Sequence, residues 1–392
     1  MKQRVAGLIL LAALGAAPAT APLSAQDPEV PIPLGDSTAR DFQPWLLSYY
    51  PYVAGGVGRG PVLMARVRYF QPAPWQDRVT YRAETWVQAG IGLEGSRLAQ
   101  IGVHAPLLAD GWRVAGRLDA RRNTRANYFG VGQFTERSDA REEADEFAYQ
   151  VHRTTWRAQA DLTRTLMGPL SVALGGSVST DRWFALSPTS VFGEDAGDAL
   201  KENDASGRLA LVVDTRNNEF DPTNGLLVEF GGQMGSGGDG YERLYGIARG
   251  YHELRKGTVV AARLAASDMF GDPPLAARFE LPGWEQPLKV YGGSTNRGLD
   301  GERRVGTGVL FGNLEVRQQL IWIQNTVGIT LVGFADAGRV FEGERLRLTT
   351  DDLDVSGGGG LVFQLLRDAM FGVRVAGGPE GARFDISGGW AF

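Results

Sequence analysis

The sequence predicts an all-β fold, a transmembrane antiparallel β-barrel of about sixteen strands. Three observations predict it. Between residues 45 and 392 almost every segment alternates polar and apolar side chains with period two, which is the period of a β-strand. Long and short connections alternate along the chain. The chain also has 54 glycines beside 10% aromatic residues, a composition typical of closely packed, curved strands.

The first 25 residues have the pattern of a secretory signal peptide. A basic start (Lys2, Arg4) precedes an apolar run over 5–17 and small residues ending at Ala25. We expect cleavage of residues 1–25, a short Pro-rich periplasmic leader over 26–44, and the barrel over 45–392. No later apolar run approaches the roughly 20 residues that a membrane-spanning helix requires.

The composition argues against several kinds of site. Cysteine is absent, and the three histidines (His104, His152, His252) stand too far apart for ligand spacing, so we expect no metal site. The net charge of -5, without a basic block, argues against nucleic acid as a partner. No Gly-x-Ser-x-Gly or phosphate-loop pattern occurs. We expect no catalytic residues, no cofactor and no enzymatic activity.

Sixteen segments fit the strand pattern. They cover residues 46–58, 62–70, 79–93, 97–105, 112–121, 147–165, 170–180, 207–215, 226–234, 241–254, 258–269, 308–320, 326–337, 354–364, 370–376 and 382–392. In the sixth segment Arg153 and Arg157 share one face, and Trp156 and Leu162 share the other. A soluble sandwich would alternate in the same way, so this pattern alone does not select a barrel.

The lengths of the connections do select it. The odd connections include the long segments 122–146, 181–206, 270–307 and 338–353, whereas the even ones include the tight turns 167–169 and 255–257. Outer-membrane barrels combine long external loops with short periplasmic turns, and a sandwich has no reason to sort its loops by parity. We therefore expect a chain embedded in the lipid of the bacterial outer membrane, with its odd connections outside.

One stretch, 291–338, holds the candidate site. Arg297 and Gly298 lie on the long loop 270–307, and Glu315 and Asp336 fall on the polar, lumen-facing registers of the next two strands. The five-donor guanidinium of arginine can serve two carboxylates at once. We therefore predict a loop latch in the lumen made of Arg297, Gly298, Glu315 and Asp336. The alternative is a solvated Arg297, with both acids simply lining a polar lumen.

These segments resemble a known family, the barrel of the outer-membrane protein assembly and two-partner secretion superfamily, also called bacterial surface antigens. Residues 214–225, with Asp214, Arg216, Pro222 and Gly225, resemble its periplasmic turn motif, and 127–132 resembles its Tyr-Phe-Gly element. The Arg-Gly pair resembles the tip of its sixth external loop, which folds into the lumen. The chain departs from the family pattern at Leu299, where an aromatic is usual. We expect the family's periplasmic polypeptide-transport-associated repeats to be lacking.

The final segment ends on an aromatic residue. Trp390 and Phe392 share a face with Phe384 and Ile386, and a last strand ending in Phe resembles the signal that the outer-membrane assembly machinery reads. We assign Trp390 and Phe392 as this assembly signal, so that machinery is an expected partner for the chain's own insertion. The alternative is an ordinary final strand.

Arginines on the polar faces suggest a basic lumen lining. They include Arg113, Arg117, Arg153 and Arg157. Such a lining would bias a pore toward anions, or it would form salt bridges that stiffen the wall; both interpretations stay open here.

The resemblance implies a role in inserting or translocating protein or lipid at the outer membrane, through a weak seam between the first and last strands. It leaves room for a periplasmic partner protein. A passive or gated pore is the alternative, and a structural surface protein is a third.

Overall fold

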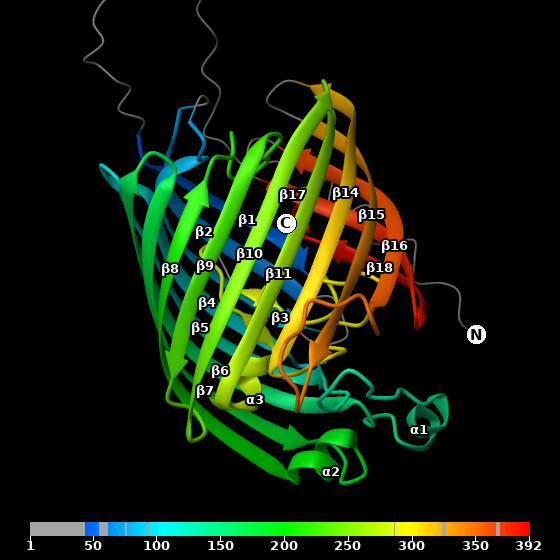
Figure 1. The fold of residues 1–392 in the computed structure, drawn as a ribbon. Coiled ribbons are helices and arrows are strands. Elements are labelled where there is room, and N and C mark those ends of the chain that lie inside the picture. Colours follow the sequence, from blue (N-terminus) through cyan, green and yellow to red (C-terminus); the bar gives the residue numbers. More distant parts are fainter. Residues whose placement is uncertain are drawn as a thin grey trace, which may run out of the picture.

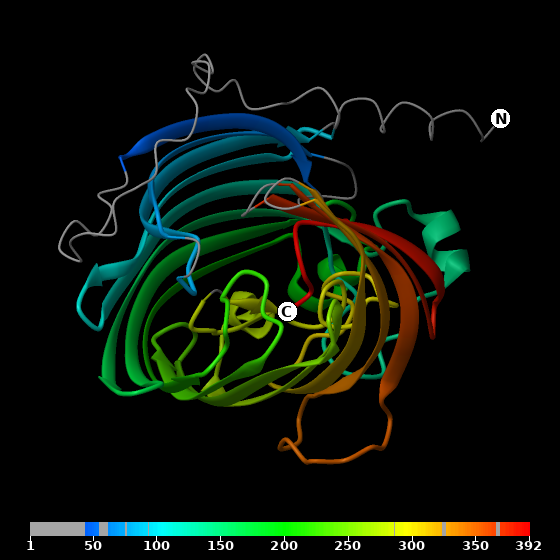
Figure 2. The same cartoon turned by 90° about the horizontal axis from the view of Figure 1, so that it is seen from above.

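The protein is a β-barrel made of one sheet. The computed structural model describes residues 44–54, 62–74, 77–92, 94–285, 287–323, 327–365 and 369–392. Sixteen strands pair with their neighbours in chain order as a 16-stranded antiparallel sheet, which curls into a barrel (Figures 1 and 2). The predicted fold class is therefore confirmed. The predicted signal peptide, 1–25, and all but the last residue of the leader, 26–44, lie outside the described residues.

The strands of the barrel follow the chain without a crossover. They are β1 (Leu46–Ala54), β2 (Val62–Pro72), β3 (Tyr81–Gly92), β4 (Arg97–Ala109), β5 (Trp112–Asn127), β6 (Gln150–Met167), β7 (Leu170–Ala185), β8 (Ala199–Asp214), β9 (Gly225–Gly235), β10 (Gly240–Arg255), β11 (Thr258–Asp272), β14 (Gly308–Ile323), β15 (Val327–Phe341), β16 (Asp354–Leu365), β17 (Ala369–Gly378) and β18 (Gly381–Ser387). Two short strands, β12 (Glu280–Leu281) and β13 (Leu288–Lys289), pair with each other.

Alternation along each strand decides which side chains face the lumen. On β14 the polar Glu315 and Arg317 are buried, whereas Leu314 and Val316 are 49% and 45% exposed on the outer face. This arrangement is the reverse of that in a soluble protein, where the apolar face of a sheet is buried. In a membrane barrel the apolar face contacts lipid and the polar face lines the interior.

The two ends of the barrel differ as the connection lengths predict. Helices α1 (Asp139–Ala144), α2 (Val191–Ala196) and α3 (Leu275–Arg278) all lie at one end, which we call the loop end (Figure 1). The opposite end, the turn end, carries tight turns such as 256–257, where Gly257 has φ +79°. A left-handed φ favours glycine at such a turn.

Four strand boundaries differ from the prediction by five residues or more. Strands β5 and β7 continue to Asn127 and Ala185 instead of residues 121 and 180. β8 begins at Ala199 instead of residue 207, because 199–206 is polar on both faces and so gives no apolar alternation. The last strand ends at Ser387 instead of residue 392. Residues 388–392, which we call the tail, turn into the barrel, and the C-terminus lies in its interior (Figure 2).

The connection between β11 and β14, residues 273–307, fills much of the barrel interior, and we call it the interior loop (Figure 2, yellow). Its residues Leu281, Tyr291 and Leu299 are at most 1% exposed and pack with Phe311 and Val340 of the wall. Burying this apolar surface fixes the path of the loop across the lumen. No helix in the described part of the chain has the length and apolar character to span a membrane.

Candidate functional site

The structure brings the four latch residues together inside the barrel. Arg297, on the interior loop, is 4% exposed. Its Nε and Nη2 donate to the two oxygens of Asp336 at 2.8 and 2.6 Å, and its backbone N–H donates to Asp336 Oδ2 at 2.9 Å. Its Nη1 donates to Glu315 Oε1. One guanidinium therefore serves two carboxylates on two adjacent strands, a geometry that a lysine could not reproduce.

The neighbours of the latch balance its charge. Arg317 Nε donates to Glu315 Oε2 at 2.9 Å, and Asn313 Nδ2 donates to Asp336 Oδ1 at 2.7 Å. The guanidinium of Arg297 also stacks 3.6 Å from the ring centroid of Phe334. Two arginines thus meet two carboxylates, and these four buried charges sum to zero.

The tip of the loop contacts the wall so closely that only glycine fits. A Cβ added to Gly298 would lie 2.3 Å from Ser356 Cβ and 2.9 Å from Gly378 Cα. The backbone N–H of Gly298 donates to Ser356 Oγ at 3.2 Å, and Asn296 Nδ2 donates to the carbonyl of Asp354 at 2.9 Å. The tip is therefore fixed against β16 and β17 as well as against the latch acids.

The predicted turn motif also folds inward, at the turn end. Arg216, which is part of the 215–224 turn, donates to both oxygens of Asp214 at 3.0 and 3.1 Å. Pro222 is buried within this turn. Gly225 has φ +106°, and a Cβ there would lie 2.3 Å from the carbonyl oxygen of Thr215. The motif residues therefore shape a compact turn.

Sequence reasoning missed Glu285, which connects this turn to the interior loop. Arg216 Nη2 donates to Glu285 Oε1 at 2.7 Å, and Arg249 Nη1 donates to Glu285 Oε2 at 2.6 Å. Although burial alone would raise the pKa of Glu285, Arg216 and Arg249 lower it to about 2. Burial alone would lower the pKa of Arg216, but the carboxylates of Glu285 and Asp214 outweigh it, so the pKa of Arg216 is raised. The interior loop is thus held by two sets of ion pairs, one at Glu285 and the other at Arg297.

The tail occupies the lumen, which corrects the predicted final strand. Trp390 Nε1 donates to Asp221 Oδ1 at 3.0 Å, and Arg317 Nη2 donates to the main-chain oxygen of Phe392 at 2.8 Å. Phe392 is 8% exposed and packs with Tyr251 and Ala261. Trp390 and Phe392 therefore do not share the outer face of β18 with Phe384, because arginines and an acid inside the barrel bind the tail there.

The lining arginines lie in the lumen, each beside an acid. The closest contacts are Arg113 with Glu219 at 2.7 Å, Arg117 with Asp119 at 2.6 Å, Arg153 with Asp181 at 2.8 Å, and Arg157 with Glu280. The arrangement matches mutual salt bridges within the wall and the loops. Glu219 and Glu280 come from the 215–224 turn and the interior loop, so these pairs also bind both segments to the wall.

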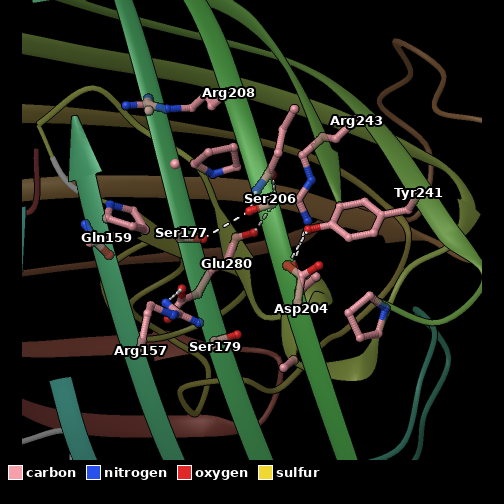
Figure 3. A pocket seen from close by; sticks show the side chains of 18 of the residues that line it. Arg157, Gln159, Ser177, Ser179, Asp204, Ser206, Arg208, Tyr241, Arg243 and Glu280 are labelled. Carbon is pink, nitrogen blue, oxygen red and sulfur yellow. Dashed lines mark hydrogen bonds and ion pairs between the residues drawn. The ribbon is translucent and has the colours of Figure 1, made fainter. Parts of the chain in front are cut away.

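Two small spaces inside the barrel have both polar and apolar side chains in their lining. One, of about 90 Å³, lies between β7, β8 and the interior loop, and Figure 3 shows its polar lining. In it Ser177 and Ser206 are joined at 3.0 Å, and Tyr241 donates to Asp204 at 3.0 Å. The other, of about 280 Å³, lies near the 215–224 turn and is lined by residues that include Tyr81, His104 and Trp284.

The element at 127–132 also contacts the interior loop. Gly132 forms an isolated bridge with Val305, and the guanidinium of Arg303 lies 4.8 Å from the ring centroid of Phe129. Residues 127–132, which belong to a second external loop, therefore contact the C-terminal part of the interior loop.

Comparison with known proteins agrees with this architecture. BamA from Haemophilus ducreyi lacking POTRA domains 1–3 is 14% identical with a TM-score of 0.55, and the match covers 88% of this chain and 70% of that one. CdiB from Escherichia coli is 11% identical with a TM-score of 0.56, and the match covers 88% of this chain and 62% of that one. At these identities the likeness shows the shared barrel fold. No curated protein matches the chain.

Comparison with a protein-family model identifies the family of the chain. The Omp85 superfamily domain matches residues 82–365, which run from β3 to β16 and include the 215–224 turn and the whole latch. Members of this superfamily are barrels embedded in the outer membrane. The match confirms the resemblance read from the motifs, and the chain belongs to the Omp85 superfamily.

Proposed function

We propose that this outer-membrane barrel inserts or translocates polypeptide or lipid through the seam between β1 and β18. The observation that carries the proposal is the sheet itself. Its order begins at β1 and ends at β18, and among the described residues no ladder joins these two strands. The ring of strands is held by backbone ladders everywhere else along this order.

The two edge strands of the sheet give the seam its chemistry. An edge strand presents free N–H and C=O groups that pair readily with an incoming strand. β18 has only 7 residues, against 16 in β14, because the chain leaves the wall at Ser387. A client strand could therefore pair with β1 over its 9 residues without first displacing β18.

Export and assembly form part of the same proposal. A signal peptide over 1–25 would direct the chain across the inner membrane, and the assembly machinery would read Trp390 and Phe392 before the tail packs into the lumen. A separate periplasmic protein would deliver clients to the seam.

A seam cross-link tests the proposal. The chain has no cysteine, so an engineered pair has no competing thiol. Cysteines scanned along β1 against position Ala382 of β18 would be oxidised in proteoliposomes, and insertion of an unfolded barrel client would be followed by its heat-modifiability. We expect oxidation to stop insertion and reduction to restore it.

The matched control is Tyr49→Cys with Val67→Cys, a directly paired, lipid-facing couple in the β1–β2 ladder. This disulfide leaves the seam free, so client insertion should continue. Insertion at the same rate with the seam oxidised and reduced would refute the proposal.

The alternative, a passive or gated pore, has weaker support. The interior loop, the 215–224 turn and the tail all lie in the lumen, and the four lining arginines named above have acidic partners. Conductance of the purified barrel in a planar bilayer, before and after Arg297→Ala, distinguishes the two. Large steady currents from the unmodified protein would favour the pore.

A further inference from the structure

A row of cations crosses the outer face of the barrel near its loop end. Its members are Arg97 on β4, Arg122 on β5, Arg182 on β7 and Lys201 on β8, and we call them the basic row. The ladders join them directly: Arg97 pairs with Arg122, Arg122 with Thr154, Thr154 with Arg182, and Arg182 with Lys201. Strands β4 to β8 lie side by side on one side of the barrel (Figures 1 and 2).

All four cations face outward. They are exposed, and each shares its face with an exposed apolar residue nearer the turn end, namely Ile101, Leu118, Val178 and Leu209. By contrast, the outward residue near the loop end of β10 is the exposed acid Glu242. The row of positive charge therefore does not continue to β10.

The basic row lies at the edge of the membrane. Each member is roughly a dozen residues from the turn at the other end of its strand, which at about 3.3 Å per residue and a tilt near 40° is about 30 Å. The apolar band of such barrels is about 25 Å tall, so the cations stand just beyond it. Trp156, 62% exposed one step closer to the turn end on β6, is an aromatic typical of this interface.

The row contains two pairs of like charges that the protein itself does not neutralise. Arg97 is directly opposite Arg122, and Arg182 is directly opposite Lys201, an arrangement that destabilises a sheet unless an anion lies between the side chains. No acid forms an ion pair with any of the four among the residues that the structure describes. The counter-charge must therefore come from outside the chain.

The spacing of the two pairs specifies the anion. The midpoints of the two pairs, one between β4 and β5 and the other between β7 and β8, are three strand spacings apart, which is about 14 Å at 4.8 Å per strand. Between them stands Thr154, an uncharged hydroxyl that can hydrogen-bond a polar headgroup. Two cationic clusters at this distance fit a headgroup that carries two separate phosphates.

We infer that the basic row is a binding site for a bisphosphorylated glycolipid of the outer leaflet, with one phosphate at Arg97 and Arg122 and the other at Arg182 and Lys201. The loop end faces the cell exterior by the asymmetry of loop lengths, so the row meets the headgroups of that leaflet. Such a lipid would neutralise both like-charge pairs and fix the orientation of this side of the barrel in the membrane. The inference concerns β4 to β8 and does not depend on the seam.

The test measures lipid binding to the full chain in detergent at low salt. Native mass spectrometry would titrate bisphosphoryl lipid A, monophosphoryl lipid A and the fully dephosphorylated lipid. At the free energy that each cation contributes near an anionic membrane surface, neutralising one pair in R97Q/R122Q should weaken bisphosphoryl lipid binding about 30-fold. That variant should also lose most of the preference for two phosphates over one, since only one cationic pair remains.

The control removes equal charge elsewhere. R345Q/R347Q neutralises two cations on the 342–353 loop, whose side chains are 64% and 63% exposed, and should bind the lipid as the unmodified protein does. Equal weakening in both double variants would overturn the inference in favour of general charge attraction. Equal affinity of the unmodified protein for all three lipids would overturn it as well.

A stability measurement excludes a merely structural role. In lipid-free detergent the unfolding midpoint of R97Q/R122Q should equal or exceed that of the unmodified protein, because a like-charge repulsion has been removed. Addition of bisphosphoryl lipid A should raise the midpoint of the unmodified protein more than that of the variant. A lower midpoint in the lipid-free variant would show that the arginines support the wall, and would overturn the inference.

Discussion

Truncation of Arg297 is the sharpest test of the latch. Arg297→Ala leaves Glu315 and Asp336, each 1% exposed, without their shared cation. Glu315 keeps Arg317 at 2.9 Å, but Asp336 keeps only uncharged donors, the side-chain amide of Asn313 at 2.7 Å and the backbone N–H of residue 297 at 2.9 Å. Leaving a buried charge without a partner costs about 3–5 kcal/mol, and because one of the two acids stays paired we expect about 3 kcal/mol.

The measurement is equilibrium unfolding in lipid vesicles, with heat-modifiability and protease nicking of the interior loop as parallel readouts. Arg347→Ala is the matched control, since its side chain is 63% exposed and its pair with Glu344 at 2.8 Å is worth at most about 1 kcal/mol. Arg297→Lys should fall between them, because one ammonium cannot bridge two carboxylates as a guanidinium does. A loss of stability in Arg297→Ala no larger than in the control, with unchanged nicking, would refute the latch.

Three further predictions follow from the same geometry. Gly298→Ala should destabilise the barrel by about 1–3 kcal/mol through overpacking against Ser356, whereas Gly301→Ala, whose Cβ meets nothing within 4 Å, should be tolerated in the same unfolding assay. Because the folded pKa of Glu285 is lowered from 4.5 to about 2, its contribution of about 3 kcal/mol should be complete above pH 5 and disappear as the pH falls toward 2. Acid unfolding curves of Glu285→Gln should lack this component. Trp390→Ala should release the tail, so hydrogen exchange in β18 should accelerate while exchange in β6 stays unchanged.

The fold was predictable from the sequence because a barrel imposes one local rule on every strand. Side chains alternate between lipid and lumen, so the faces of β14 and β15 could be assigned from the order of polar and apolar residues alone. The inward registers of Glu315 and Asp336 followed directly. The Arg-Gly pair on a long odd-numbered loop then required only that the loop reach into the lumen.

The missed features depend on contacts between distant segments. Alternation continues through residues 388–392, so the sequence offers no local reason for the strand to stop at Ser387. The reason lies in Asp221, which is 169 residues from Trp390 in sequence. Likewise, Glu285 and Arg216 are 69 residues apart in sequence. Both lie on connections, where no strand periodicity indicates how far the chain reaches into the lumen.

These distant contacts join the latch to the seam. Arg317 donates to Glu315 at 2.9 Å and to the main-chain oxygen of Phe392 at 2.8 Å, so one side chain holds a latch acid and the tail together. Arg263 repeats the arrangement, donating to the main-chain oxygens of Ala391 at 3.0 Å and of Ser294 in the interior loop at 2.9 Å. Extension of β18 toward full strand length would withdraw the tail from both arginines and weaken the shell around the loop tip. The tail that ends the seam strand and the tip of the interior loop are therefore held by the same two arginines within one buried network.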